Sequence, residues 1–155
     1  EALRHEARRR GRGREVGHVH RRTRRVAPRV CDRVPARVHV ASAHKVPEKV
    51  IEKVAELNRR TDPTVIITVV GMSNGLSGVV AGSSVHPVIA CPNCKDREDY
   101  AINIHSTLQM PSDVPVLTVL SPKNAALAAV RILAGSDLTL RKKVEDRIKQ
   151  IKSKY

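Results

Sequence analysis

Residues 65–78 read Val-Ile-Ile-Thr-Val-Val-Gly-Met-Ser-Asn-Gly-Leu-Ser-Gly, and this stretch decides the fold. Its first six residues are all β-branched, which is typical of a strand buried on both faces of a parallel sheet. The glycine-rich turn at 71–78 then leads into a predicted short helix. A buried strand that turns into a helix through glycine predicts an α/β fold with parallel strands.

The same alternation of strand and helix continues on both sides of this stretch. Upstream, we expect a short strand at 38–40 and a helix from Pro47 to about residues 59–62. Downstream, we expect strands at 87–91 and 114–120, separated by a polar loop and a helical piece at 104–110, then helices at 122–134 and 137–153. The pattern predicts a three-layer α/β/α domain with a parallel, flavodoxin- or Rossmann-like sheet and helices on both faces.

The formal net charge of +14 is spread unevenly along the chain. Residues 1–37 hold 13 Arg against 4 acidic residues, and residues 141–155 hold 7 basic against 2 acidic residues. Residues 38–140 balance at 9 basic and 9 acidic residues. A charge of this size usually suggests a nucleic-acid or anionic-membrane partner. Here the basic character belongs to the two ends, and the middle has an ordinary globular composition.

The segment 1–35 differs from the rest of the chain in residue composition and in hydrophobic periodicity. It shows neither a helical nor a strand period, and its only residue among Leu, Ile and Met is Leu3. Such a segment cannot bury enough apolar surface to offset the ordering of its backbone, so we predict that it is disordered. The sequence therefore predicts an aberrant Arg-rich segment at 1–35 and one domain at 36–155, which includes the C-terminal helix.

The cysteines indicate neither a disulfide framework nor a metal centre. Cys31, Cys91 and Cys94 are too few and too irregularly spaced for a disulfide scaffold, so we expect a reducing, cytoplasmic compartment. Cys91-x-x-Cys94 has the spacing of half a metal site, but no second pair follows it. We therefore expect no metal. No apolar run reaches the length of a membrane span, so we expect no membrane partner.

Two loops follow consecutive predicted strands, where ligands bind in open parallel sheets. The loop Ser42–Lys45 carries a hydroxyl, an imidazole and an ammonium within four residues. The loop Gly71–Gly78 lets backbone amides approach a ligand closely and ends at a helix N-terminus, which favours anions. An imidazole beside an anion-binding loop suits proton transfer on an anionic substrate.

The exact residue sequences of these two loops resemble motifs of the phosphoribosylaminoimidazole carboxylase family. Ser42-Ala43-His44-Lys45, with Pro47-Glu48 after it, resembles the signature loop of that family, and Gly71-Met72-Ser73-Asn74-Gly75-Leu76 resembles its second active-site loop. Three later strings resemble further family segments in the same order: His86–Pro92, Leu108–Ser112 and Leu120–Ala126. The resemblance covers residues 38–155, about three quarters of the chain.

The resemblance implies a cofactor-free enzyme of de novo purine synthesis. In one branch of the family, CO2 carboxylates 5-aminoimidazole ribonucleotide (AIR) at C4. In the other branch, a mutase moves the carboxylate of N5-carboxyaminoimidazole ribonucleotide from N5 to C4. The mutases usually have Arg after the histidine and an Ala-Ala-His-Leu second loop. With Lys45 and Ser73-Asn74-Gly75-Leu76, this chain resembles the direct carboxylases more closely, and the mutase is the alternative.

The resemblance also implies roles for single residues and an assembly. His44 is expected to be catalytic and to move the C4 proton. The substrate-binding residues implied by the matched loops are Ser42, Ala43, Lys45, Gly71, Ser73, Asn74, Gly75 and Leu76. The partners implied are AIR and CO2, with no cofactor and no specific nucleic acid. The family assembles as homo-octamers whose C-terminal helices reach neighbouring subunits, so we expect an octamer.

One departure from the family lies at the N-terminal end. Family members begin with a strand and a Gly-Ser-x-Ser-Asp loop that contacts ribose and phosphate, and this chain has no such string. Out-of-frame reading of GC-rich codons yields Arg, Ala, Gly, Pro and Val, which dominate residues 1–35. We therefore hypothesise a frameshift or a wrongly assigned start. Loss of the phosphate loop predicts impaired nucleotide binding.

Two other functions compete with the enzyme. An Arg-rich arm can neutralise nucleic-acid phosphates, but the chain has no Trp or Phe to stack on bases. The second rival is an inactive family member that keeps the fold without catalysis.

Overall fold

The sheet formed within residues 34–155 has three parallel strands in the order β1-β2-β3. The computed structural model describes residues 34–155. The strands are β1 (Ile66–Val70), β2 (Val88–Pro92) and β3 (Leu117–Thr118). Ile66 pairs with Val88 and Ile89 pairs with Leu117. The helices are α3 (Pro47–Asn58), α4 (Gly75–Ser83), α5 (Arg97–Asn103), α6 (His105–Leu108), α7 (Pro122–Leu133) and α8 (Leu138–Lys152).

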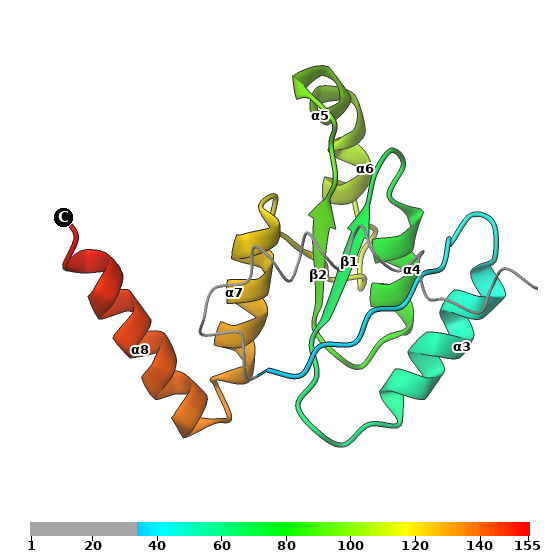
Figure 1. Cartoon of the computed structure of the whole chain (residues 1–155). Coiled ribbons are helices and arrows are strands. Elements are labelled where there is room, and N and C mark those ends of the chain that lie inside the picture. The colour runs from blue at the N-terminus through cyan, green and yellow to red at the C-terminus, as the bar shows by residue number, and fades with distance from the viewer. Residues whose placement is uncertain (1–33) are drawn as a thin grey trace, which may run out of the picture.

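Helices cover both faces of this sheet, as predicted. Figure 1 shows α7 on one side of the strands, and α4 with α3 on the other. The central strand β2 explains why, because its side chains alternate between two hydrophobic cores. Val88 packs with residues of α3 and α4, whereas Ile89 and Cys91 pack with alanines of α7. Ile89 and Cys91 are fully buried, and the whole strand is shielded apart from its last residue.

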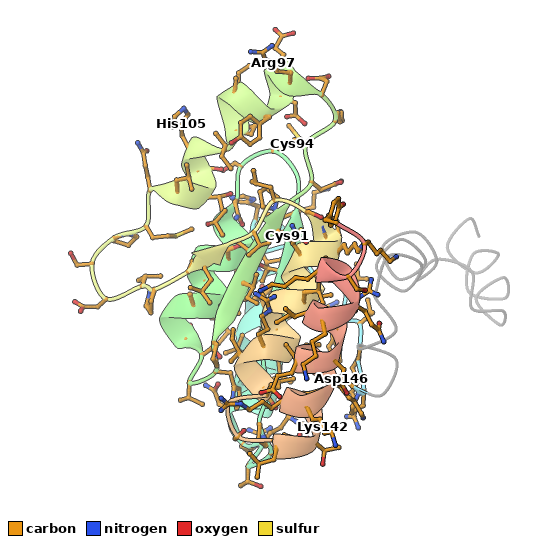
Figure 2. All side chains as sticks on the ribbon, turned by 90° about the vertical axis from the view of Figure 1, so that its left-hand side faces the viewer. Cys91, Cys94, Arg97, His105, Lys142 and Asp146 are labelled. Carbon is orange, nitrogen blue, oxygen red and sulfur yellow. The ribbon has the colours of Figure 1, made fainter. Side chains whose placement is uncertain are left out.

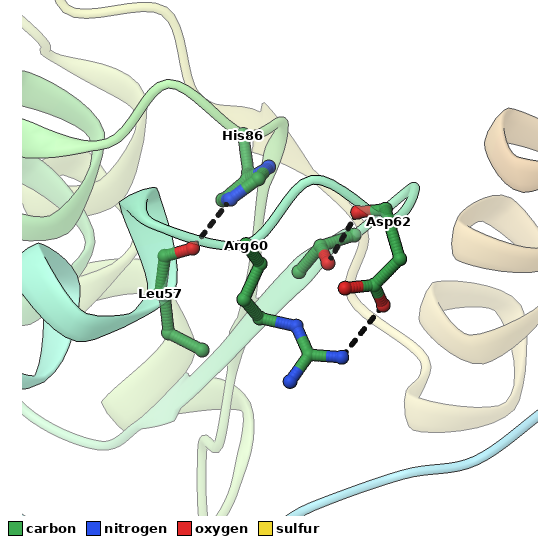
Figure 3. Close-up of polar contacts among 5 residues, drawn as sticks. Leu57, Arg60, Asp62 and His86 are labelled. Carbon is green, nitrogen blue, oxygen red and sulfur yellow. Dashed lines mark hydrogen bonds and ion pairs between the residues drawn. The ribbon is translucent and has the colours of Figure 1, made fainter.

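The helices α3 and α7 begin and end close to the predicted residues, whereas α4 begins at Gly75, inside the segment 71–78 that was predicted to be a turn. Pro47 and Pro122 occupy the first turns of α3 and α7, where the missing N–H has no intrahelical role. At the other end of α3, Nε2 of His86 lies 2.9 Å from the carbonyl oxygen of Leu57 (Figure 3). Just beyond this contact, Arg60 pairs with Asp62. His86 therefore caps the C-terminal end of α3.

The predicted strand at 38–40 is wrong. Residues 35–42 form no strand, and Val40 is 79% exposed. Alternating apolar residues form a strand only if another strand accepts their hydrogen bonds. Within residues 34–155, no strand pairs with this segment. The expectation that residues 65–70 are buried on both faces is also wrong, because β1 is the edge strand of the described sheet and Ile67 is 37% exposed.

Two further expectations need correction. The segment after β2 was predicted to be a polar loop, but α5 begins there, with Asp96 as its N-cap and Asp96 Oδ1 accepting the Asp99 amide at 2.8 Å. The Asp-x-x-Asp spacing was the missed signal. The strand predicted at 114–120 shrinks to Leu117–Thr118. Pro115 has no amide to donate, which keeps the start of that segment out of the sheet.

The C-terminal helix α8 extends from α7 as a separate arm (Figure 1). Its N-cap Asp137 accepts the Leu140 amide at 2.9 Å, and Leu140 packs with Val130 and Ala134. No helix in residues 34–155 is long and apolar enough to cross a membrane. The expectations for 1–35, namely disorder and a replaced strand and loop, fall outside the described residues.

Candidate functional site

The loop Ser42–Lys45 is held mainly by bonds that it makes to itself. The carbonyl of Ser42 accepts the Val46 amide at 2.9 Å, and its hydroxyl accepts the Lys45 amide at 3.3 Å. Ala43 turns inward and packs against the core of α3 and α4. His44 and Lys45 are exposed. The turn itself lies on the same side of the molecule as the arrow tips of the strands (Figure 1).

The loop Gly71–Asn74 is constrained more tightly. A Cβ on Gly71 would lie 3.0 Å from the carbonyl oxygen of Asn93, so a larger residue would press on the neighbouring backbone. Met72 has a φ of 57°, in the left-handed region that a side chain rarely adopts. Met72 and Ser73 point outward and are exposed, whereas Asn74 is only 4% exposed.

Asn74 organises the start of α4 from inside the protein. Its Oδ1 accepts the backbone amide of Ser77 at 3.0 Å and the hydroxyl of Ser77 at 2.8 Å, and its Nδ2 donates to Oγ1 of Thr107 at 2.9 Å. The carboxamide is thus occupied by the protein and faces the interior. The geometry of the Asn74 side chain is that of a structural helix cap. The backbone of the loop, rather than this side chain, faces the open side.

The two loops meet at His44 and Gly75. A Cβ on Gly75 would lie 2.7 Å from Nε2 of His44 and 3.0 Å from its Cε1. The imidazole therefore rests directly on the first residue of α4, in a space that only glycine leaves open. Leu76 packs against the same core cluster as Ala43, which fixes the two loops to one support.

The start of α4 offers hydrogen-bond donors beside this imidazole. The amides of Asn74 and Ser77 are taken by Ser106 and Asn74. Within residues 34–155, no hydrogen bond engages the amide of Gly75 or Leu76. Two such donors at the positive end of a helix dipole favour an anionic group. The site therefore places the imidazole of His44 beside two backbone amides at the start of α4 that make no hydrogen bond within residues 34–155.

The other predicted residues contribute less directly. Gly71 faces the Asn93 carbonyl, and the Ser42 hydroxyl is used within its own turn. Lys45 and Ser73 are exposed, and the structure gives them no contact with His44. Sequence reasoning missed four hydroxyl residues behind the second loop: Thr68, Ser77, Ser106 and Thr107. Only Ser77 left a signal, since it lies three residues after the N-cap Asn74.

The cysteines and the other polar groups show no second centre. Burial raises the pKa of the Cys91 thiol, and burial together with Asp99 and Asp96 raises the pKa of the Cys94 thiol. Figure 2 shows Cys91 at the strand and Cys94 nearer α5, and His105 pointing away from the sheet. In the described part of the chain, no three His, Cys, Asp or Glu side chains gather as metal ligands would.

Comparison with known proteins agrees with this architecture. The family model described as "AIR carboxylase" matches residues 23–154, so the match begins inside the Arg-rich segment. The chain is 41% identical over 123 residues to phosphoribosylaminoimidazole carboxylase of Archaeoglobus fulgidus, covering 79% of this chain and 67% of that protein. It is 46% identical over 96 residues to the probable multifunctional protein ADE2 of Caenorhabditis elegans, covering 62% of this chain but only 22% of that longer protein.

A solved structure extends the likeness to the fold. The crystal structure of Treponema denticola PurE superposes with a TM-score of 0.80 at 33% identity, covering 93% of this chain and 89% of that one. With the parallel sheet, the two matched loops and the family match over most of its length, the chain belongs to the AIR carboxylase family.

Proposed function

We propose that this chain carboxylates AIR at C4 with CO2, in de novo purine synthesis. The observation that carries the proposal is the contact between His44 and Gly75, which sets an imidazole against the open amides of α4. Family membership supports the reaction class, which comprises the carboxylase and the related mutase.

The proposed reaction needs no cofactor, because the aminoimidazole ring is electron-rich. C4 attacks the carbon of CO2, a C–C bond forms, and the new carboxylate takes the negative charge. The proton on C4 then passes to the imidazole of His44, which restores the aromatic ring. The amides of Gly75 and Leu76 stabilise the developing carboxylate.

The remaining residues of the two loops have supporting roles in this proposal. Lys45 supplies a point charge for the phosphate or the carboxylate of the substrate, with less directionality than an arginine would give. Ser42 and Ala43 shape the loop that carries His44. Gly71, Ser73 and the backbone of Asn74 form the wall opposite the imidazole.

The mutase is the alternative within the same family. Lys45 and the string Ser73-Asn74-Gly75-Leu76 favour the direct carboxylase. The purified full chain should therefore incorporate labelled bicarbonate into 4-carboxyaminoimidazole ribonucleotide when AIR is supplied. Turnover of N5-carboxyaminoimidazole ribonucleotide alone would assign the mutase, and turnover of neither would contradict the proposal.

We also propose that the enzyme is a cytoplasmic homo-octamer. An apolar groove between α7 and α8 supports assembly, since it is lined by Leu127, Val144, Ile148 and Ile151. Ile151 is 42% exposed, although it continues an apolar stripe. Sedimentation of the full chain should give the mass of eight copies, and a stable monomer would overturn this part of the proposal.

A further inference from the structure

A chain of buried hydroxyl groups runs from β1 to α6 behind the second loop. Thr68 lies in the middle of β1, and its Oγ1 is 2.7 Å from Oγ of Ser77 in α4. Ser77 bonds Asn74, and Asn74 bonds Thr107 and Ser106 in α6. Thr68, Ser77, Asn74 and Thr107 are all at most 5% exposed.

The direction of these hydrogen bonds follows from the number of protons available. Ser77 has one hydroxyl proton, and it donates this proton to Oδ1 of Asn74 at 2.8 Å. Thr68 therefore donates to Ser77 at 2.7 Å, and the Ile89 carbonyl, 3.4 Å from Thr68 Oγ1, is the weaker acceptor for the same proton. The Asn74 carboxamide is thus oriented, with its oxygen toward α4 and its nitrogen toward α6.

Two consecutive hydroxyls of α6 hold Asn74 from outside the loop. Oγ of Ser106 accepts the backbone amide of Asn74 at 3.0 Å and donates its own proton to the Asn103 carbonyl at 2.8 Å. Oγ1 of Thr107 accepts the side-chain amide at 2.9 Å. The backbone two residues earlier, at Met72, has a positive φ and needs such support to persist.

We propose that Ser106 and Thr107 are positioning residues for the carboxylation reaction, an inference that rests on the proposed function. They act through Asn74, which precedes Gly75 directly in the chain. By fixing Asn74, they keep the first residue of α4 beneath the imidazole of His44. The short helix α6 therefore supports the site through Asn74.

The test is a pair of substitutions at Thr107 in the full chain. Thr107→Val keeps the shape and removes the acceptor for Asn74 Nδ2. We expect kcat to fall about tenfold to a hundredfold with a smaller change in KM, because misplacement of a catalytic group affects the reaction step. Thr107→Ser keeps the hydroxyl and should restore most of kcat. Amide hydrogen exchange of residues 71–77 should become faster in Thr107→Val and stay slow in Thr107→Ser.

Two control variants separate positioning from general stability. Thr118→Val makes the same chemical change in β3, at a half-buried threonine that makes no side-chain hydrogen bond within residues 34–155, and should leave kcat unchanged. Val130→Ala destabilises the core of α7 and α8, away from the loop, and should lower Tm while kcat stays normal below the transition.

Three results would overturn the inference. The first is a Thr107→Val variant with normal kcat and slow amide exchange. The others are a kcat in Thr107→Ser as low as that in Thr107→Val, or an equal loss of kcat in Val130→Ala at a matched loss of Tm. An unaltered chain that carboxylates nothing would instead overturn the proposed function. The exchange measurement then still decides whether α6 holds the loop, so the two failures are distinguishable.

Discussion

The two loops that meet at the site are held in opposite ways. The Ser42–Lys45 turn closes on itself with two local hydrogen bonds, and its imidazole and ammonium are exposed. The Gly71–Asn74 loop is tied to two helices through the buried side chain of Asn74. The exposed side chains of the first loop, His44 and Lys45, can therefore be changed without harm to the fold, whereas Asn74 of the second loop is part of the core. The difference indicates that the first loop supplies chemistry and the second supplies a fixed surface for it.

The substitution His44→Asn is the strongest test of this difference between the two loops. Because His44 is exposed, we expect the Tm to stay within error of the unaltered chain. Carboxylation should fall by about a hundredfold to ten-thousandfold, since the proton acceptor is lost. Steady-state assays beside thermal melts would measure both. His39→Asn, also exposed and outside the turn, is the matched control. Normal turnover in His44→Asn would contradict the assigned role.

Gly75→Ala should have the next largest effect. Gly75 has no positive φ, so alanine fits the backbone, and only the imidazole stands in the way of its methyl group. We expect the free energy of unfolding to stay constant or rise by up to about 1 kcal/mol. Activity should fall about tenfold to a hundredfold because His44 is displaced.

The control for that prediction lies in the same helix. A Cβ on Gly82 would meet Val114 at 3.8 Å, an ordinary contact. Gly82→Ala should therefore stabilise to a similar extent and keep full activity. Equal activity in Gly75→Ala and Gly82→Ala would show that the contact between His44 and Gly75 has no part in catalysis.

Ser42→Ala should have a smaller effect. It removes one hydrogen bond of 3.3 Å at an open turn, for which we expect about 0.5 kcal/mol in the free energy of unfolding. The turn keeps its backbone bond from Val46 to Ser42, so activity should fall only a few-fold. Chemical denaturation and steady-state kinetics would check both values. A loss as large as that of His44→Asn would give Ser42 a direct role in the reaction.

The smallest effect concerns the support behind the buried loop. The Lys95 amide, at 2.8 Å, and the Asn103 side chain lower the pKa of Asp99. A carboxyl with a lowered pKa in the fold adds stability above its unfolded pKa, and this is lost as the pH falls through its folded value. The protection of the α5 amides against exchange, relative to the intrinsic rate at each pH, should therefore fall only under acid conditions. Asp99→Asn should show faster exchange already at neutral pH, whereas Glu98→Gln should not. Exchange that does not depend on acid would contradict this account.

Most of the helices could be predicted because their signals are local. Pro47 and Pro122 mark the starts of α3 and α7, and the apolar run at 88–91 forms the buried centre of the sheet. The segments whose structure was predicted wrongly depend on partners that are distant in the sequence. Residues 38–40 form no strand because no described strand lies beside them, and β1 is exposed on one side for the same reason. Strand pairing is a property of two segments, so one segment cannot reveal it.

The sequence by itself determined the family and the two loops, because the residue strings around His44 and Gly75 are specific to that family. Only the tertiary structure decided that the His44 ring rests on Gly75, and that Asn74 faces inward to Thr107. Both contacts join residues about thirty positions apart in the chain. Their distances depend on how the helices pack, and packing is set by the whole core at once.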